Sequence, residues 1–238
     1  MNALEVKDLC KTYGDFKLDN VSFELPKGKI MGFVGQNGAG KTTTIRLILN
    51  MAKKQSGEIS ILGFDTAKEE IPARESIGVV FDDTFFPDNW TLADIEKAIK
   101  GFYKEWDSNK YNDLLKSFEL DKKKKVSELS RGMKMKLSLD VAMSHNAKLL
   151  ILDEPTSGLD PVARDELLTV FNDYIKDGEA SILFSTHITT DLEKSADLIT
   201  LIHDGKLYFT GLKDEFLKEH KGKSIDDILV AIAKGEQI

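Results

Sequence analysis

GQNGAGKTT, residues 35–43, is the stretch that decides the fold of this chain. It matches the pattern G-x-x-x-x-G-K-[ST], the P-loop, whose glycines let successive backbone N–H groups point at one chain of phosphates. A strand-like run over residues 30–34 precedes it and a helical run over residues 43–51 follows, as the motif requires. That helix adds the partial positive charge of its N-terminus. The sequence therefore predicts a site for a nucleoside triphosphate.

Two side chains of the loop carry chemistry of their own. Lys41 supplies a point charge for the outer phosphates, and the Thr42 hydroxyl can ligate Mg²⁺. The cofactors that we expect are therefore ATP and Mg²⁺. The loop residues predicted to contact the nucleotide are Gly35, Asn37, Gly38, Ala39, Gly40, Lys41, Thr42 and Thr43.

The composition fits a soluble globular protein, with 238 residues of which 41% are hydrophobic and 31% charged. A net charge of −7 argues against bulk binding of nucleic acid, so no nucleic-acid partner is expected. The single cysteine, Cys10, excludes an internal disulfide, and its strand-like surroundings predict a small buried side chain. No apolar run approaches the ~20 residues that span a bilayer, and the N-terminus has acids where a signal peptide would be basic and then apolar. We expect a cytoplasmic protein that reaches the membrane only through partners.

Apolar runs, alternation and turn residues divide the chain into elements. The pattern is helical from residue 91 to 120, where Thr91 and Asp94 resemble a capping box, and no clear strand lies between residues 82 and 130. We therefore expect one ATPase domain, residues 1–238, with a helical lobe over 82–148 and a core plus β subdomain formed by 1–81 and 149–238. The amphipathic tail, residues 224–234, is expected to pack on its own domain. The predicted strands are residues 3–13, 16–25, 30–34, 57–62, 77–81, 149–152, 181–185, 198–203 and 206–210.

Two acids end the short apolar strand over residues 149–152. A buried strand that runs directly into Asp153 and Glu154 needs a positive charge to meet them, and a P-loop upstream supplies one as Mg²⁺–ATP. Asp153 would hold the metal ion, and Glu154 would act as general base on the attacking water. This pairing favours a Walker B segment.

Three further motifs make the pattern specific. LSRGM (129–133) stands upstream of LLILDEP, SGLD (157–160) follows it, and FSTH (184–187) comes later. In this order the chain resembles the nucleotide-binding subunit of an ABC transporter, from Tyr13 to the strand pair after His187. The resemblance implies an α/β fold: a P-loop NTPase core with a mixed central sheet, an N-terminal antiparallel β subdomain and an inserted helical lobe.

The resemblance also implies roles for single residues. Tyr13 corresponds to the aromatic residue that stacks on adenine, and His187 to the switch histidine that contacts the γ-phosphate and assists catalysis. Ser130 and Gly132 correspond to signature residues that meet the γ-phosphate across a dimer interface, and Asp160 to the residue that links the two sites.

Departures from the family pattern fall at two places. The signature commonly has a second glycine and a glutamine where this chain has Arg131 and Met133. The glutamine expected after the strand 77–81 is replaced by Asp82. Since carboxylate oxygen ligates Mg²⁺, we assign Asp82 a place near the metal, although its charge puts the relay of nucleotide state to the membrane subunit in doubt.

The predicted function is ATP hydrolysis that powers a membrane transporter. The short chain, LSRGM and the compact helical lobe look most like the bacterial type-2 exporters, near the Pmt and Ytr systems, which export peptides, antibiotics or lipids. The expected partners are integral membrane transporter subunits and a second nucleotide-binding subunit, in a homo- or heterodimer at the inner face of the cell membrane. The alternatives are a soluble, non-transport ATPase of the ABC type and a regulatory subunit that binds ATP without hydrolysis.

Overall fold

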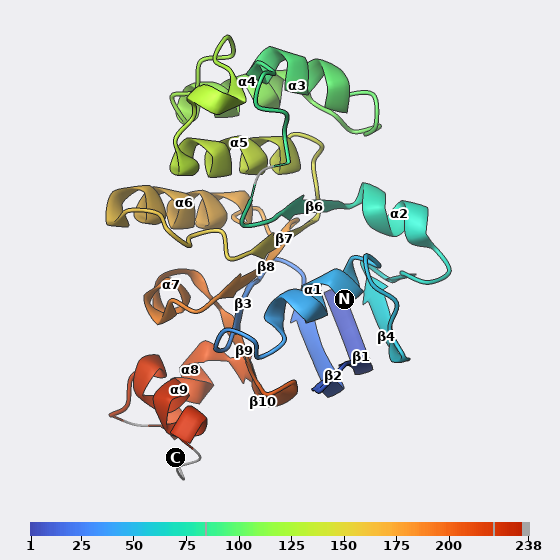
Figure 1. Cartoon of the computed structure of the whole chain (residues 1–238), viewed down its shortest axis with the longest axis vertical. Helices are drawn as coiled ribbons and strands as arrows, with labels where there is room; N and C mark the ends of the chain where they lie inside the picture. The colour runs from blue at the N-terminus through green and yellow to red at the C-terminus, as the bar shows by residue number, and fades with distance from the viewer. Residues whose placement is uncertain (84, 221, 235–238) are drawn as a thin grey trace.

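Two β-sheets form the body of the molecule in residues 1–83, 85–220 and 222–234, which the computed structural model describes (Figure 1). One is a six-stranded sheet in the order β10-β9-β3-β8-β7-β6, and the other a four-stranded sheet in the order β2-β1-β4-β5. The expected α/β class, with a mixed central sheet and an N-terminal antiparallel subdomain, is confirmed.

The six-stranded sheet is parallel from β9 to β6, and β10 pairs antiparallel with β9. Its inner strands are short apolar runs buried on both faces, as parallel sheets require. Within β7, Leu149 and Ile151 face one hydrophobic core, whereas Leu150 and Leu152 face another. The strands are β3 (Ile30–Val34), β6 (Ile77–Val80), β7 (Leu149–Asp153), β8 (Ser181–Thr186), β9 (Leu198–His203) and β10 (Lys206–Leu212).

The four-stranded sheet covers one face of the central sheet, and helix α1 packs with both in a shared core (Figure 1). That core holds Phe23 of β2 stacked on Phe33 of β3, with ring centroids 5.5 Å apart. Because the P-loop leads from β3 directly into α1, the start of α1 lies near the carboxyl end of β3. The elements are β1 (Asn2–Tyr13), β2 (Phe16–Pro26), α1 (Lys41–Ile48), β4 (Ser56–Ile61) and β5 (Phe64–Asp65), followed by α2 (Glu70–Glu75).

Helices cover the opposite face of the central sheet. Ile225, Ile228 and Ile232 of the C-terminal helix belong to the core on this face, so the amphipathic tail packs on its own domain as expected. The helices of this layer are α5 (Arg131–Met143), α6 (Pro161–Tyr174), α7 (Thr189–Ser195), α8 (Lys213–Glu219) and α9 (Ile225–Lys234).

A helical lobe lies at the top of Figure 1, between β6 and β7 in the chain. It comprises α3 (Leu92–Ile99), α4 (Ser108–Ser117), the 3-10 turn η1 (Val126–Glu128) and α5, which also packs on the sheet. The predicted capping box is present: the Thr91 hydroxyl accepts from the Asp94 N–H, and the Asp94 carboxylate accepts from the Thr91 N–H. The lobe has its own apolar core, around the fully buried ring of Tyr111.

Some expectations need correction. Helix α1 begins at Lys41 instead of residue 43, because Gly40 adopts φ 113° and caps it, and it ends at Ile48 instead of residue 51. The short elements α2 and β5 were not predicted, since neither carries enough apolar residues to show a period. Cys10 is half-buried, and its thiol donates to the Asn20 side chain at 3.2 Å, so it is not the buried thiol that we expected. Among the described residues, no helix is long and apolar enough to cross a bilayer.

Candidate nucleotide site

A cavity of about 360 Å³ opens where the P-loop meets the ends of β3 and β7. Carboxyl ends of parallel strands converge at one edge of a sheet, so residues far apart in sequence meet there. The lining residues come from the start of β2, from the P-loop and from the segments after β6, β7 and β8. They are Phe16, Gln36, Asn37, Gly38, Gly40, Lys41, Thr42, Thr43, Asp82, Glu154, Ser157 and His187.

Glycine geometry shapes the wall made by the P-loop. Gly38 adopts φ 84° beside open space, and Gly40 adopts φ 113°, a conformation that L side chains rarely adopt. A Cβ on Gly35 would come within 2.3 Å of the Ile202 carbonyl oxygen, so only glycine fits there. Ala39 is buried, and its carbonyl oxygen accepts from the Gly205 N–H at 3.0 Å, which ties the loop to the β9–β10 turn.

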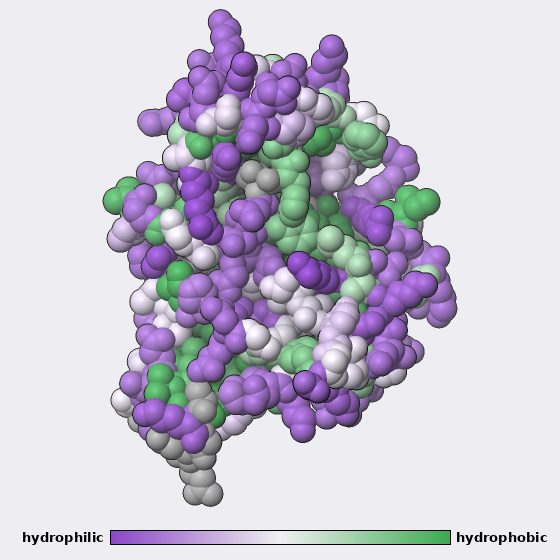
Figure 2. Space-filling view, viewed as in Figure 1, coloured by the Kyte–Doolittle hydropathy of each residue, from purple (hydrophilic) through white to green (hydrophobic). Residues whose placement is uncertain are grey.

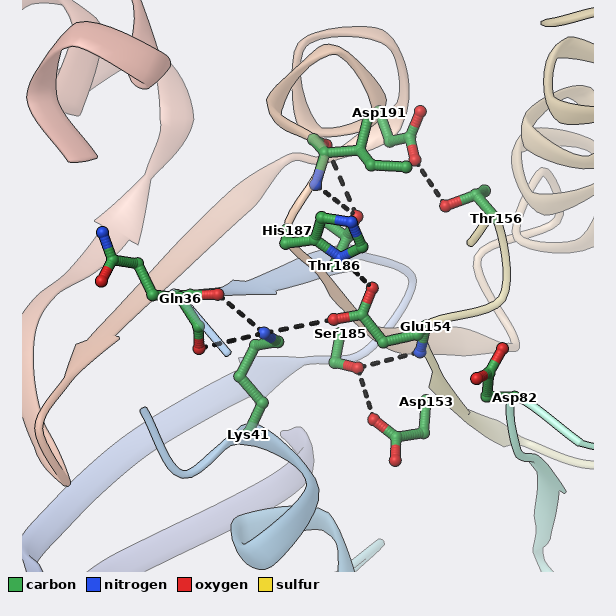
Figure 3. Close-up of polar contacts among 12 residues, drawn as sticks. Gln36, Lys41, Asp82, Asp153, Glu154, Thr156, Ser185, Thr186, His187 and Asp191 are labelled. Carbon is green, nitrogen blue, oxygen red and sulfur yellow. Dashed lines mark hydrogen bonds and ion pairs between the residues drawn. The ribbon is translucent and has the colours of Figure 1, made fainter. Parts of the chain in front are cut away.

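Lys41 points into the site from the first position of α1 (Figure 3). Its ammonium donates to the Gly35 carbonyl oxygen at 2.7 Å and lies 3.1 Å from Glu154 Oε1. The side chain is only 6% exposed, so Glu154 balances a charge that burial would otherwise make costly. A triphosphate would offer this ammonium a stronger anionic partner than one carboxylate.

Glu154 joins Lys41 to the predicted switch histidine (Figure 3). Its Oε2 lies 2.7 Å from His187 Nδ1, and its own backbone N–H donates to Ser185 Oγ at 2.9 Å. The residue adopts φ 52°, a left-handed conformation that is uncommon for residues other than glycine. The structure therefore brings both predicted catalytic residues, Glu154 and His187, into direct contact.

Asp153 lies at the end of β7, facing Thr42. Thr42 Oγ1 donates to Asp153 Oδ1 at 3.3 Å, and Ser185 Oγ donates to the same oxygen at 2.6 Å. The side chain is 6% exposed, so these hydroxyls fix a nearly buried carboxylate. Two of the three predicted metal ligands, Thr42 and Asp153, are thus neighbours, although the described residues contain no cluster of three metal-binding acids, histidines or cysteines.

Asp82, the third predicted metal residue, lines the same cavity but has a partner outside it. Its carboxylate forms an ion pair with the guanidinium of Arg131, at the start of α5. Both side chains are about half exposed. The two departures from the family pattern thus contact one another.

Tyr13 lies just outside the cavity lining, at the end of β1, and is 47% exposed. The lining aromatic is Phe16, its partner across the β1–β2 turn, whose ring is 3.0 Å from a Cβ built on Gly40. Sequence reasoning missed Phe16, Gln36 and Ser157; the signal for Phe16 was an aromatic residue directly after the Gly14–Asp15 turn. The adenine-stacking role of Tyr13 stays a prediction.

Ser130, Gly132 and Asp160 do not line this cavity. Ser130 is the N-cap of α5 and accepts from the Met133 N–H at 3.3 Å, whereas Asp160 caps α6 through the N–H groups of Val162 and Ala163. A Cβ on Gly132 would meet Leu159 at 3.7 Å, so the signature packs against the SGLD segment.

The comparisons with known proteins agree with this geometry. The family model for the ABC transporter matches residues 18–157, more than half of the chain. The bacitracin transport ATP-binding protein BcrA of Bacillus licheniformis is 37% identical over 210 residues, which cover 86% of this chain and 68% of the relative. The ABC transporter ATP-binding protein YtrB of Bacillus subtilis is 32% identical over 220 residues, which cover 90% of this chain and 75% of the relative.

A solved structure, described as the ATP-binding subunit of an ABC transporter, has 30% sequence identity and a TM-score of 0.87. The match covers 97% of this chain and 99% of that one. Family, fold and site chemistry therefore converge: the chain belongs to the ABC transporter family, as an ATP-binding and ATP-hydrolysing subunit.

Proposed function

We propose that this subunit powers a membrane exporter of peptide, antibiotic or lipid by closing with a second nucleotide-binding subunit around ATP. The observation that carries the proposal is the contact chain Lys41–Glu154–His187 at the mouth of the phosphate cavity. It unites a phosphate-binding cation, a general base and a hydrogen-bonding imidazole. The names of BcrA and YtrB support a transport role, since one is a bacitracin transport protein and the other an ABC transporter protein.

The donor set beside Lys41 fits Mg²⁺. Thr42 Oγ1 and Asp153 Oδ1 are hard oxygen atoms 3.3 Å apart, and Ser185 orients the carboxylate. We propose that Thr42 and Asp153 hold the ion, with Asp82 near it. When bound, the ion supplies charge stabilisation on the phosphate oxygens.

The chemistry of this chain begins with an exchange of partners at Lys41. Nucleotide phosphates take the ammonium away from Glu154, which frees the carboxylate to accept a proton from the attacking water. His187 remains in contact with Glu154 Oε2 and orients it. The Glu154 carboxylate pairs with Lys41 when the site is empty and acts as general base when nucleotide is bound. The general base therefore becomes available only when the nucleotide occupies the site.

The half-site across the dimer would come from the signature and SGLD segments of the second subunit. In that proposal Ser130 and Gly132 meet the γ-phosphate, and the N-terminus of α5 adds its partial positive charge. Asp160 links the two sites. The single ABC-type ATPase domain, with its helical lobe over residues 82–148, is the unit that closes.

A hydrophobic groove supports a membrane-protein partner. It lies between α5 and the segment after β6 and includes Phe81, Phe85 and Phe86, of which Phe85 is 80% exposed. Figure 2 shows hydrophobic residues gathered between the helical lobe and the body of the molecule. Exposed apolar patches of this kind mark interaction surfaces. We propose that integral membrane subunits hold the chain here, at the cytoplasmic face of the membrane.

Purification of the tagged chain from detergent-solubilised membranes tests the transporter proposal. We expect an integral membrane protein to co-purify and to change the ATPase rate. A chain that never associates with such a protein, and whose hydrolysis is indifferent to membranes, would instead support the soluble ATPase. Co-sedimentation with RNA that weakens with salt would point the same way.

A further inference from the structure

Asp191 is a buried acid that the proposed mechanism leaves unused. It lies in the first turn of α7, four residues after His187, and is only 1% exposed. Its Oδ2 accepts from Thr156 Oγ1 at 2.6 Å (Figure 3), and burial raises the pKa of the carboxyl above its ordinary value. A buried carboxylate is costly unless both oxygens have partners.

The second oxygen of Asp191 lacks a partner. Among the described residues, neither Asp191 Oδ1 nor the buried Arg164 Nε makes a hydrogen bond. The two atoms are 4.0 Å apart, whereas a charge-assisted hydrogen bond needs ~2.7–2.9 Å. A donor and an acceptor of opposite charge therefore face each other, about one ångström too far apart to bond.

Three segments of the candidate site lie next to the Asp191–Arg164 pair: the one after Glu154, the start of α6 and the one after His187. Thr156 follows Glu154 by two residues, and His187 precedes Asp191 by four. Arg164 lies in the first turn of α6, where its N–H donates to the carbonyl oxygen of the cap residue Asp160 at 3.0 Å. Asp191 thus connects the SGLD segment, which faces the second subunit in the proposed dimer, with both predicted catalytic residues.

We propose that Asp191 is a positioning residue whose bond to Arg164 forms when two subunits close over ATP, and that this bond holds Glu154 and His187 in their working positions. This inference rests on the proposed dimerisation. A shift of about one ångström between α6 and α7 in the closed state would let one hydrogen bond satisfy two buried groups that the open subunit leaves without partners. The bond stabilises the closed state selectively, because the open state does not contain it.

The same two helices offer a matched control. Lys194 of α7 forms an ion pair with Asp165 of α6 at 2.5 Å, next to Arg164 in sequence. Both partners are more than half exposed, and such surface pairs contribute little. Asp165→Asn therefore removes a link between α6 and α7 without touching the buried contact.

The variants differ in whether position 164 keeps a hydrogen-bond donor for Asp191 Oδ1. Arg164→Met keeps an apolar chain of similar length and removes Nε, whereas Arg164→Gln places an amide nitrogen at the same number of bonds from the backbone. Asp191→Leu removes both carboxylate oxygens at similar volume. Each is made in the Glu154→Gln background, in which ATP-bound dimers should accumulate without turnover.

The dissociation constant of the ATP-bound dimer, from analytical ultracentrifugation, is the primary measurement. We expect Arg164→Met and Asp191→Leu each to weaken the dimer ~10-fold or more, as loss of a hydrogen bond to a charged group implies. The double variant should be no weaker than the worse single variant. Arg164→Gln and Asp165→Asn should match the Glu154→Gln parent, and ATP affinity of the monomer should be unchanged.

Two results would overturn the inference, and they are distinguishable. If the parent dimerises with ATP but Arg164→Met and Asp191→Leu dimerise equally well, the contact is structural only, whatever their effect on urea unfolding of the free subunit. If the parent itself fails to dimerise with ATP, the proposed dimer falls and the inference with it. Arg164→Met keeps the test valid should Asp191→Leu not fold, since Arg164 is partly exposed.

Discussion

Asp82 and Arg131 form an ion pair that joins the end of β6 to the start of α5. The guanidinium also lies against the SGLD segment, because a Cβ on Gly158 would come within 2.8 Å of Arg131 Nη1. Both residues depart from the family pattern. Asp82 adds a negative charge beside the phosphate cavity, and Arg131 adds a positive charge to the signature. In the structure each charge neutralises the other.

Arg131→Ala is expected to weaken ATP binding, because it leaves the Asp82 carboxylate unbalanced at the edge of the phosphate cavity. We predict a ~3- to 10-fold loss of affinity in EDTA and a smaller loss with Mg²⁺, which would itself balance the charge. The measurement is nucleotide binding by fluorescence or calorimetry.

The control for that prediction is the same substitution in an Asp82→Gln background, where it should have no effect on affinity. Folding stability should change by only ~0–1 kcal/mol in either background, since the pair is half exposed. An equal loss of affinity with glutamine at position 82 would contradict the pairing.

Asp140 gives the helical lobe a pH-dependent stability. Burial raises the pKa of its carboxyl to about 8, and Oδ2 has no hydrogen-bond partner among the described residues, although Ser144 donates to Oδ1 at 2.9 Å. The native state therefore keeps a proton that the unfolded state releases above pH ~4, so the free energy of unfolding falls as pH rises towards 8. Asp140→Asn removes this loss.

We expect Asp140→Asn to raise the melting temperature by an amount that grows from pH 5 to pH 8. Asp113→Asn, on the exposed face of the same lobe, is the control and should show no such trend. A stabilisation that is equal at both pH values would show that Asp140 does not titrate in this window.

Two P-loop glycines should respond differently to alanine. Gly35→Ala drives a Cβ to 2.3 Å from the Ile202 carbonyl oxygen, whereas Gly38→Ala meets open space and has only its φ of 84° to strain. We predict a cost of ~1–2 kcal/mol for Gly38→Ala from backbone strain, and of ~3 kcal/mol or more for Gly35→Ala, because its Cβ would clash with a backbone atom that cannot move aside. Urea unfolding of the nucleotide-free subunit measures both, and equal costs would refute the steric argument.

Much of the fold was predictable because local signals determine it. Each of these signals determines the structure of only a few neighbouring residues: the P-loop glycines, the apolar run of β7 and the helix caps at Thr91, Ser130 and Asp160. Helix α2 has only one buried residue, Ala73, so its sequence has no apolar period from which a helix could be predicted.

The contacts between distant residues could not be derived in the same way. Asp82 and Arg131 are 49 residues apart, and Thr156 and Asp191 are 35 apart. Only the order of strands in the sheet brings them together. The place of Phe16 in the cavity wall could not be derived from the sequence for a related reason: side chains alternate along a strand, and the turn decides which aromatic ring faces the loop.

ATP turnover by the wild type and by Glu154→Gln, measured with the oligomeric state in the same samples, tests the central claim most directly. In the proposed mechanism Glu154, which contacts Lys41 and His187, is the general base. We therefore predict that the wild type hydrolyses ATP, while Glu154→Gln loses at least ~100-fold in rate and accumulates as an ATP-bound dimer. Equal turnover by the two proteins, with no ATP-dependent dimer, would contradict the account.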